Sequence, residues 1–133
     1  MNYAFTDAEL TEIRELRQIS PRDFLVVDRT GNTPAFVPEH ILNLWSTKEF
    51  HNGVGVGLGA RYVSSRFIDV DNSYKMDHYL TVDGVLFYRY RRWKWTLNFK
   101  NITDQEYETR GFGPVSVLPA DPFAVYGKIE FSP

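Results

Sequence analysis

The chain has 133 residues, enough for one domain at most, and its 43% hydrophobic and 16% aromatic content excludes an intrinsically disordered protein. A formal net charge of −2 gives no reason to expect nucleic acid as a partner. Because the sequence contains no cysteine, a disulfide scaffold and a thiolate metal site are both excluded.

The N-terminal third predicts a strand followed by a long loop. Residues 2–12 alternate between two faces, as strand residues do. Residues 11–17 suit either a helical turn, because Glu and Arg there favour helix, or an extension of that strand. Prolines and a glycine mark residues 20–38 as a long loop, in which residues 24–28 suit a short strand.

Residues 40–50 and 54–66 predict two further strands joined by a tight turn at His51-Asn52-Gly53. Asn-Gly supplies the positive φ that short hairpins require. The second of these strands sets an apolar row against a row of glycines and one arginine: Val54, Val56, Leu58, Ala60 and Tyr62 against Gly55, Gly57, Gly59 and Arg61. A glycine row permits close backbone approach, so in a large barrel we expect it to face the interior, where something else fills the space.

A second long loop, residues 67–78, leads into the hairpin around which the chain is organised. Residues 79–90 and 93–100 predict two long strands joined by a turn at Arg91-Arg92. Alternation gives each strand one apolar and one more polar face, and each arm has about ten residues, roughly what a tilted strand needs to cross a bilayer. Periodicity alone also fits a soluble hairpin.

The chain closes with a third long loop, residues 104–122, and a last strand, residues 123–131. Long and short connections therefore alternate, as the outside loops and periplasmic turns of outer-membrane barrels do. Aromatic residues gather at both predicted strand ends, which is typical of a membrane interface. The aromatic residues are Phe50, Tyr88, Tyr90, Trp93, Trp95 and Phe131 at the short-turn end, and Tyr62, Phe67, Tyr79 and Phe123 at the other. A soluble sandwich with an aromatic core is the alternative.

Two motifs lie in the central hairpin and at its exit. The first is Y-x-x-V-D from Tyr79 to Asp83, and the second is W-x-x-x-L-x-x-x-N-I-x-D-x-x-Y from Trp93 to Tyr107. Together they resemble the C-terminal end of TonB-dependent outer-membrane receptors of the ferric-siderophore type. Further segments are similar to the same family and keep their order along the chain: residues 2–9, 37–40, 44–45 and 59–66.

The resemblance implies an all-β fold: an antiparallel up-and-down meander of about six long strands, part of a transmembrane β-barrel of ~22 strands. Residues 1–133 would form the C-terminal part of that barrel, without the plug domain and the N-terminal strands. About six strands cannot close so wide a barrel, so taken alone we expect an open, curved sheet. The start of the chain lacks the pattern of a signal peptide, and Pro133 stands where such receptors usually carry a terminal aromatic residue.

In function, the resemblance implies part of a receptor for active uptake of a ferric siderophore in the outer membrane of a Gram-negative bacterium. Its expected partners are the ferric siderophore, the TonB system acting through the plug, outer-membrane lipid and the barrel assembly machinery. We expect no enzymatic activity and no cofactor, since iron would travel only as the siderophore chelate. The alternative is a soluble all-β module that binds a small ligand.

Candidate site residues follow from these expectations. We expect five residues to face the barrel lumen: Arg61, Asp83, Thr96, Asn98 and Lys100. Five loop residues suit an anionic, aromatic chelate by charge and stacking: Arg66, Tyr74, Lys75, Arg110 and Phe112. Residues 101–104 end in a turn-forming Asp and should fix the strand exit into the third loop. No metal site is expected, because the three histidines share no ligand spacing with one another or with a carboxylate.

Overall fold

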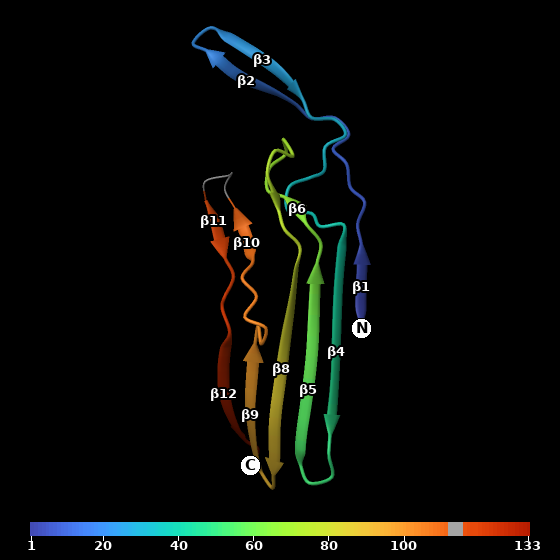
Figure 1. Cartoon of the computed structure of the whole chain (residues 1–133), viewed down its shortest axis with the longest axis vertical. Helices are drawn as coiled ribbons and strands as arrows, with labels where there is room; N and C mark the ends of the chain where they lie inside the picture. The colour runs from blue at the N-terminus through green and yellow to red at the C-terminus, as the bar shows by residue number, and fades with distance from the viewer. Residues whose placement is uncertain (112–115) are drawn as a thin grey trace.

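A six-stranded antiparallel sheet forms the body of the protein (Figure 1), in the order β1-β4-β5-β8-β9-β12. The computed structural model describes residues 1–111 and 116–133. The sheet strands are β1 (Asn2–Phe5), β4 (His40–Glu49), β5 (Val54–Val63), β8 (Tyr79–Tyr90), β9 (Trp93–Lys100) and β12 (Ala124–Phe131). The predicted all-β meander is therefore confirmed, and across the described residues no helix is long and apolar enough to span a membrane.

Each long connection carries its own small hairpin. The three pairs are β2 (Arg14–Ser20) with β3 (Asp23–Asp28), β6 (Arg66–Phe67) with β7 (Lys75–Met76), and β10 (Glu108–Gly111) with β11 (Val117–Pro119). All three lie beyond the same end of the sheet, and the two short turns lie at the other end (Figure 1). We call these the loop end and the turn end. The predicted alternation of long and short connections is confirmed.

The first strand is shorter than its alternating pattern predicted. Pairing with β4 ends at Phe5, and the Thr6 amide makes one more bond, to the Glu39 carbonyl at 2.9 Å. The chain then leaves the sheet, and residues 14–20 form β2 in a separate hairpin with β3. The helical alternative for residues 11–17 is thus wrong from Arg14 onward, because cross-strand bonding to β3 overrides the helix propensity of Glu and Arg. The short strand predicted at residues 24–28 is confirmed as part of β3.

The sheet has one apolar face, and the described residues leave its side chains exposed. Residues directly opposite each other in an antiparallel pair share a face, and Leu86 lies opposite both Val56 and Leu97. Four side chains of this apolar face have large exposed fractions: Leu58 60%, Leu86 41%, Leu97 43% and Ile129 66%. These side chains do not meet in a sealed centre, as they would in a compact soluble barrel.

The small buried core lies at the loop end instead. Among the described residues, the buried hydrophobic side chains are Val63, Ile68, Met76 and Tyr79. They belong to the last residue of β5, the first of β8 and the connection between them. The densest packing therefore supports the long loops, and the sheet below them is a single layer.

Candidate functional site at the loop end

The face opposite the apolar one, the polar face, carries all five residues predicted to face a lumen. Arg61 lies opposite Thr81, and Asp83 lies opposite Gly59. On β9 the remaining three, Thr96, Asn98 and Lys100, alternate with the apolar row that contains Leu97. The register thus places the five together on one face. That this face lines the lumen of a larger barrel remains a prediction.

The glycine row of β5 lies on this polar face, and aromatic rings of the neighbouring strands cover it. A Cβ atom added to Gly59 would overlap the Trp45 ring from β4, and one added to Gly55 would overlap the Phe87 ring from β8. The space above the glycines is therefore filled by the chain's own side chains. This close approach requires residues without a Cβ.

Near the loop end the polar face is hollowed. Arg61 and Thr81 line this polar hollow, together with Tyr107 of the third loop and Tyr126 of β12. Asp83 also lines it: its Oδ2 accepts a bond from Lys100 Nζ at 2.6 Å, and its Oδ1 accepts one from the Asn101 backbone N–H at 3.0 Å. The hollow thus presents charged and phenolic groups at a level just below the long loops.

Asn101 fixes the exit from β9. Its backbone adopts a φ of 47°, a left-handed conformation that Asn tolerates better than most residues. The side chain is buried at 5% exposure and bridges both ends of the third loop. Nδ2 donates to the carbonyls of Gln105 at 3.0 Å and Asp121 at 3.2 Å, and Oδ1 accepts from the Gln105 amide at 3.0 Å.

Asp104 completes this anchor. It also has a φ of 47°, and its Oδ1 accepts a hydrogen bond from the Phe123 amide at 2.8 Å. The two ends of the third loop are therefore held together just where β9 stops and β12 begins. The predicted role of residues 101–104 at the strand exit is confirmed.

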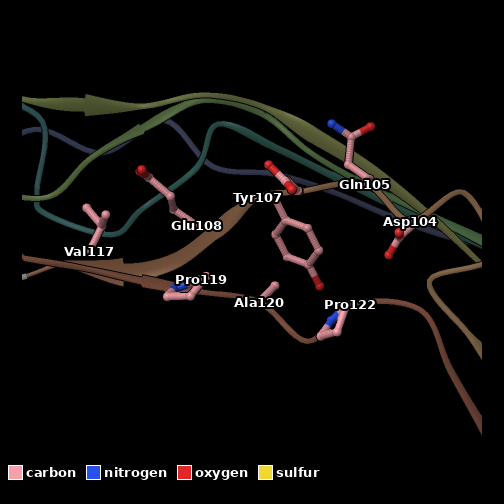
Figure 2. A pocket seen from close by; sticks show the side chains of 9 residues that line it. Asp104, Gln105, Tyr107, Glu108, Val117, Pro119, Ala120 and Pro122 are labelled. Carbon is pink, nitrogen blue, oxygen red and sulfur yellow. The ribbon is translucent and has the colours of Figure 1, made fainter.

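A cleft opens between the two arms of the third loop. Figure 2 shows the Tyr107 ring lying between them, with Ala120 and Pro122 on the opposite arm. Tyr107 also stacks on Tyr79, with ring centroids 4.1 Å apart. Burial is the main cause that raises the pKa of the Tyr107 phenol above its ordinary value, and the neighbouring Tyr79 adds to the rise.

The loop residues predicted to contact a chelate have different environments. Lys75 on β7 and Arg110 on β10 are exposed, and Tyr74 is half-buried. Arg66 is not the exposed loop residue that the sequence suggested: it is 7% exposed, and it donates to backbone carbonyls of β10. Phe112 lies outside the described residues. Contact of any of these residues with a ligand stays a prediction.

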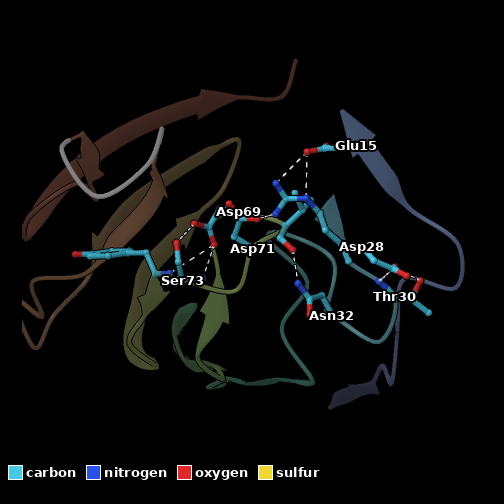
Figure 3. Close-up of polar contacts among 10 residues, drawn as sticks. Glu15, Asp28, Thr30, Asn32, Asp69, Asp71 and Ser73 are labelled. Carbon is cyan, nitrogen blue, oxygen red and sulfur yellow. Dashed lines mark hydrogen bonds and ion pairs between the residues drawn. The ribbon is translucent and has the colours of Figure 1, made fainter. Parts of the chain in front are cut away.

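The first and second long loops meet through a buried arginine that sequence reasoning did not single out. The side chain of Arg29, 8% exposed, forms ion pairs with Glu15, at 2.9 Å, and with Asp71 (Figure 3). Close by, Asn32 Nδ2 donates to the Val70 carbonyl at 2.8 Å. Because Asp71 is distant in the sequence, no local pattern could have indicated this cluster.

A local carboxylate contact shapes the second loop in the same region. Asp69 accepts hydrogen bonds from both the hydroxyl and the amide of Ser73 (Figure 3). The hydroxyl bond is the largest cause that holds the pKa of Asp69 below its ordinary value. Across the described residues, no group of three or more His, Asp or Glu side chains is placed to hold a metal ion.

Comparison with known proteins identifies the family of this chain. The family model described as TonB dependent receptor-like, beta-barrel, matches residues 1–102. The chain belongs to this family. Relatives of the chain include the ferrichrome outer membrane transporter/phage receptor of Escherichia coli K12, 32% identical over 115 residues, and the ferrioxamine receptor of Yersinia enterocolitica, 30% identical over 84 residues.

These matches cover most of this chain but a small part of each relative. The E. coli relative is matched over 80% of this chain and 14% of its own length, and the Yersinia relative over 58% and 12%. The siderophore receptor PiuA of Acinetobacter baumannii has a TM-score of 0.82 at 25% identity, covering 97% of this chain and 18% of PiuA. The chain thus has the fold of one stretch of a TonB-dependent receptor barrel.

Proposed function

We propose that this chain is a wall segment of an outer-membrane receptor that takes up a ferric siderophore in a Gram-negative bacterium. The observation that carries the proposal is the two-faced sheet, which is apolar and uncovered on one side and polar and hollowed on the other, in a family whose relatives are named as siderophore receptors. A membrane strand needs lipid on its apolar side and a water-accessible interior on its other side.

The aromatic residues at the turn end support a membrane interface. Trp93 and Trp95 stack with their centroids 6.2 Å apart, Tyr88 stacks on Trp95 at 5.8 Å, and Phe131 lies 4.8 Å from Trp93. All four side chains belong to the apolar face. A belt of this kind suits the boundary between hydrocarbon and headgroups, where amphipathic rings are favoured.

The polar face would meet the plug and the passing chelate. On this proposal Arg61 and the Asp83–Lys100 pair hydrogen-bond to the plug, through which the TonB system supplies energy. Lys75 and Arg110 would attract an anionic chelate arriving from outside, since both cations are exposed at the loop end. Iron enters this scheme only as the chelated cargo, and the chain performs no chemistry on it.

The soluble ligand-binding module finds less support. A small barrel would enclose its apolar side chains around a ligand, whereas Leu58 and Ile129 of the apolar face are 60% and 66% exposed. The hollow on the polar face is lined in part by charged side chains, unlike the apolar cavity of such a barrel.

A pair of arginine substitutions tests which face meets lipid. Leu86→Arg places a charge on the apolar face, and Asn98→Arg places the same charge on the polar face of the adjacent strand at nearly the same level. In phospholipid vesicles we expect L86R to destabilise the inserted state by about 2–4 kcal/mol and N98R to be near neutral, as for lipid and lumen positions of barrels. Equal effects of the two variants would contradict the proposal.

Chelate binding is tested with radioactive iron in two forms, an anionic ferric tris-catecholate and uncharged ferrichrome. Lys75→Ala and Arg110→Ala should each weaken binding of the catecholate roughly tenfold, because each removes a charge-assisted contact. Arg92→Ala is the matched control, since it removes an exposed cation at the turn end. If the chain in its membrane binds neither chelate, the uptake proposal is wrong.

A further inference from the structure

Arg66 joins the second long loop to the third. From the first position of β6, its Nη2 donates to the carbonyl oxygens of Glu108 at 3.0 Å and Thr109 at 3.2 Å, both on β10. Its guanidinium carbon lies 5.6 Å from the centroid of the Tyr79 ring. Arg66 is 7% exposed, so these contacts are shielded from water. Charge-assisted hydrogen bonds are stronger in such a shielded place than in water.

One of the strands joined by Arg66, β10, carries the exposed cation Arg110, and the other, β6, pairs with the strand that carries Lys75. β6 pairs with β7, where Phe67 lies opposite Lys75. Arg110 directly follows Thr109, whose carbonyl Arg66 holds. The path from Lys75 to Arg110 thus consists of the backbone pairing of β7 with β6 and the buried side-chain bonds of Arg66 to β10. The Arg66 guanidinium therefore lies on the series of contacts that connects Lys75 to Arg110.

An apolar seam runs beside this polar link. Ile68, which is 5% exposed, packs against Gly111, where an added Cβ atom would lie 3.3 Å from the Ile68 Cδ1. The seam brings the two loops together but is non-directional, as apolar contacts are. Both carbonyl bonds of Arg66 come from Nη2, and they supply the direction, because the two N–H bonds of this nitrogen lie at a fixed angle in the guanidinium plane.

We propose that Arg66 is a positioning residue: it does not contact the ligand, and it holds Lys75 and Arg110 at the spacing that receives an anionic chelate. The identity of the ligand rests on the proposed function, whereas the joining of the two loops does not. Arg29 serves a different junction, because its ion pairs with Glu15 and Asp71 link the first loop to the second. The two buried arginines thus offer a matched comparison.

The loop geometry is measured without any ligand. The chain has no cysteine, so the double variant Asp77→Cys/Leu118→Cys, at exposed positions in the second and third loops, accepts two spin labels without side reactions. In the full chain in membranes, electron–electron double resonance should show one narrow distance between the labels. Arg66→Gln should broaden and lengthen that distribution, and Arg29→Gln should leave it unchanged.

A second variant and a second label pair keep the test decisive. Arg66→Lys keeps the positive charge but not the planar amino group whose two N–H bonds point in fixed directions, so it should also broaden the distribution. Labels at Asn52→Cys and Arg92→Cys, at the turn end, should keep their distance in every variant and so report an intact sheet. An unchanged 77–118 distance in R66Q or R66K, or equal broadening in R29Q, overturns the proposal.

Chelate binding gives a readout that general loosening would not move. With Arg66 present, combining Lys75→Ala and Arg110→Ala should change tris-catecholate affinity non-additively, because both cations meet one ligand. In R66Q the affinity should fall roughly tenfold and the two effects should become additive. Altered distances without chelate binding by the unmodified chain would refute the uptake function alone, and binding with unaltered distances would refute the positioning role alone.

Discussion

Replacing Asn101 by alanine should open the third loop without disturbing the sheet. The substitution removes three side-chain hydrogen bonds of 3.0–3.2 Å, each contributing about 1 kcal/mol net. It also places alanine at a φ of 47°, which costs about 1 kcal/mol more. Gln105 and Asp121 are themselves exposed, so water can hydrate part of what is released. We therefore expect a loss of about 2–3 kcal/mol.

Amide hydrogen exchange measures this opening at the loop itself. A loss of about 2–3 kcal/mol raises the local opening equilibrium roughly 30- to 150-fold. The amides of Gln105 and Phe123, which bond to the Asn101 and Asp104 side chains, should exchange faster by that factor in N101A. The Arg89 amide, bonded to the Gly53 carbonyl at the turn end, should keep its rate.

Two further variants separate the causes. Asn101→Gly removes the same bonds but accepts the positive φ, so its loss should be smaller than that of N101A by about 1 kcal/mol. Asn98→Ala truncates the same residue type three positions earlier, on β9, where no hydrogen bond to a described residue anchors the loop, and it should have little effect. Exchange at Gln105 that rises less than threefold in N101A would refute the reasoning, as would equal acceleration in N98A.

Two other predictions concern the glycine row and the second loop. Gly59→Ala should displace the Trp45 ring at a cost of about 1–3 kcal/mol, seen as a shift in tryptophan emission, because the new Cβ overlaps that ring. Gly127→Ala, where the Cβ would sit 3.8 Å from its nearest neighbour, is the control and should change nothing. Ser73→Ala should raise the pKa of Asp69 in a carboxyl carbon NMR titration. Because the pKa of Asp69 is lower in the folded state, the contribution of this carboxylate to stability is present above its unfolded-state pKa of about 3.9 and is lost as the pH falls through its folded-state pKa. If the pKa of Asp69 does not move in S73A, the Ser73 hydroxyl is not the main cause of the lowered pKa.

The strands of the sheet were predictable because their faces follow a fixed period of two. Alternation alone put Leu86 and Leu97 on one face and Asp83 and Lys100 on the other, and the register bears this out. The Asn52-Gly53 turn was also predictable from the sequence, because a tight turn depends on the residues within it: Gly53 has the positive φ, 82°, that such a turn requires.

What the sequence could not supply depends on contacts between distant segments. Arg66 looked like a solvated loop cation, because nothing near it in the sequence reveals the Glu108 and Thr109 carbonyls that hold it. The β2–β3 hairpin, whose pairing is local, was missed for a different reason. Its residues alternate much as those of β1 do, and only cross-strand pairing with residues 23–28 shows that they leave the main sheet.

The distribution of buried side chains gives the protein two ends with different physical requirements. At the loop end Met76 is 1% exposed and Val63 is 3% exposed, so the loops have a small apolar core of their own that is closed to water. The apolar face of the sheet has none: Leu58 and Ile129 remain more than half exposed, and each would gain about 1–2 kcal/mol only if an apolar medium covered it. On the proposed function, a bilayer would supply that medium along the whole apolar face at once. The loop end could then hold its geometry by internal packing, whereas the sheet would reach its full stability only with lipid against its apolar face.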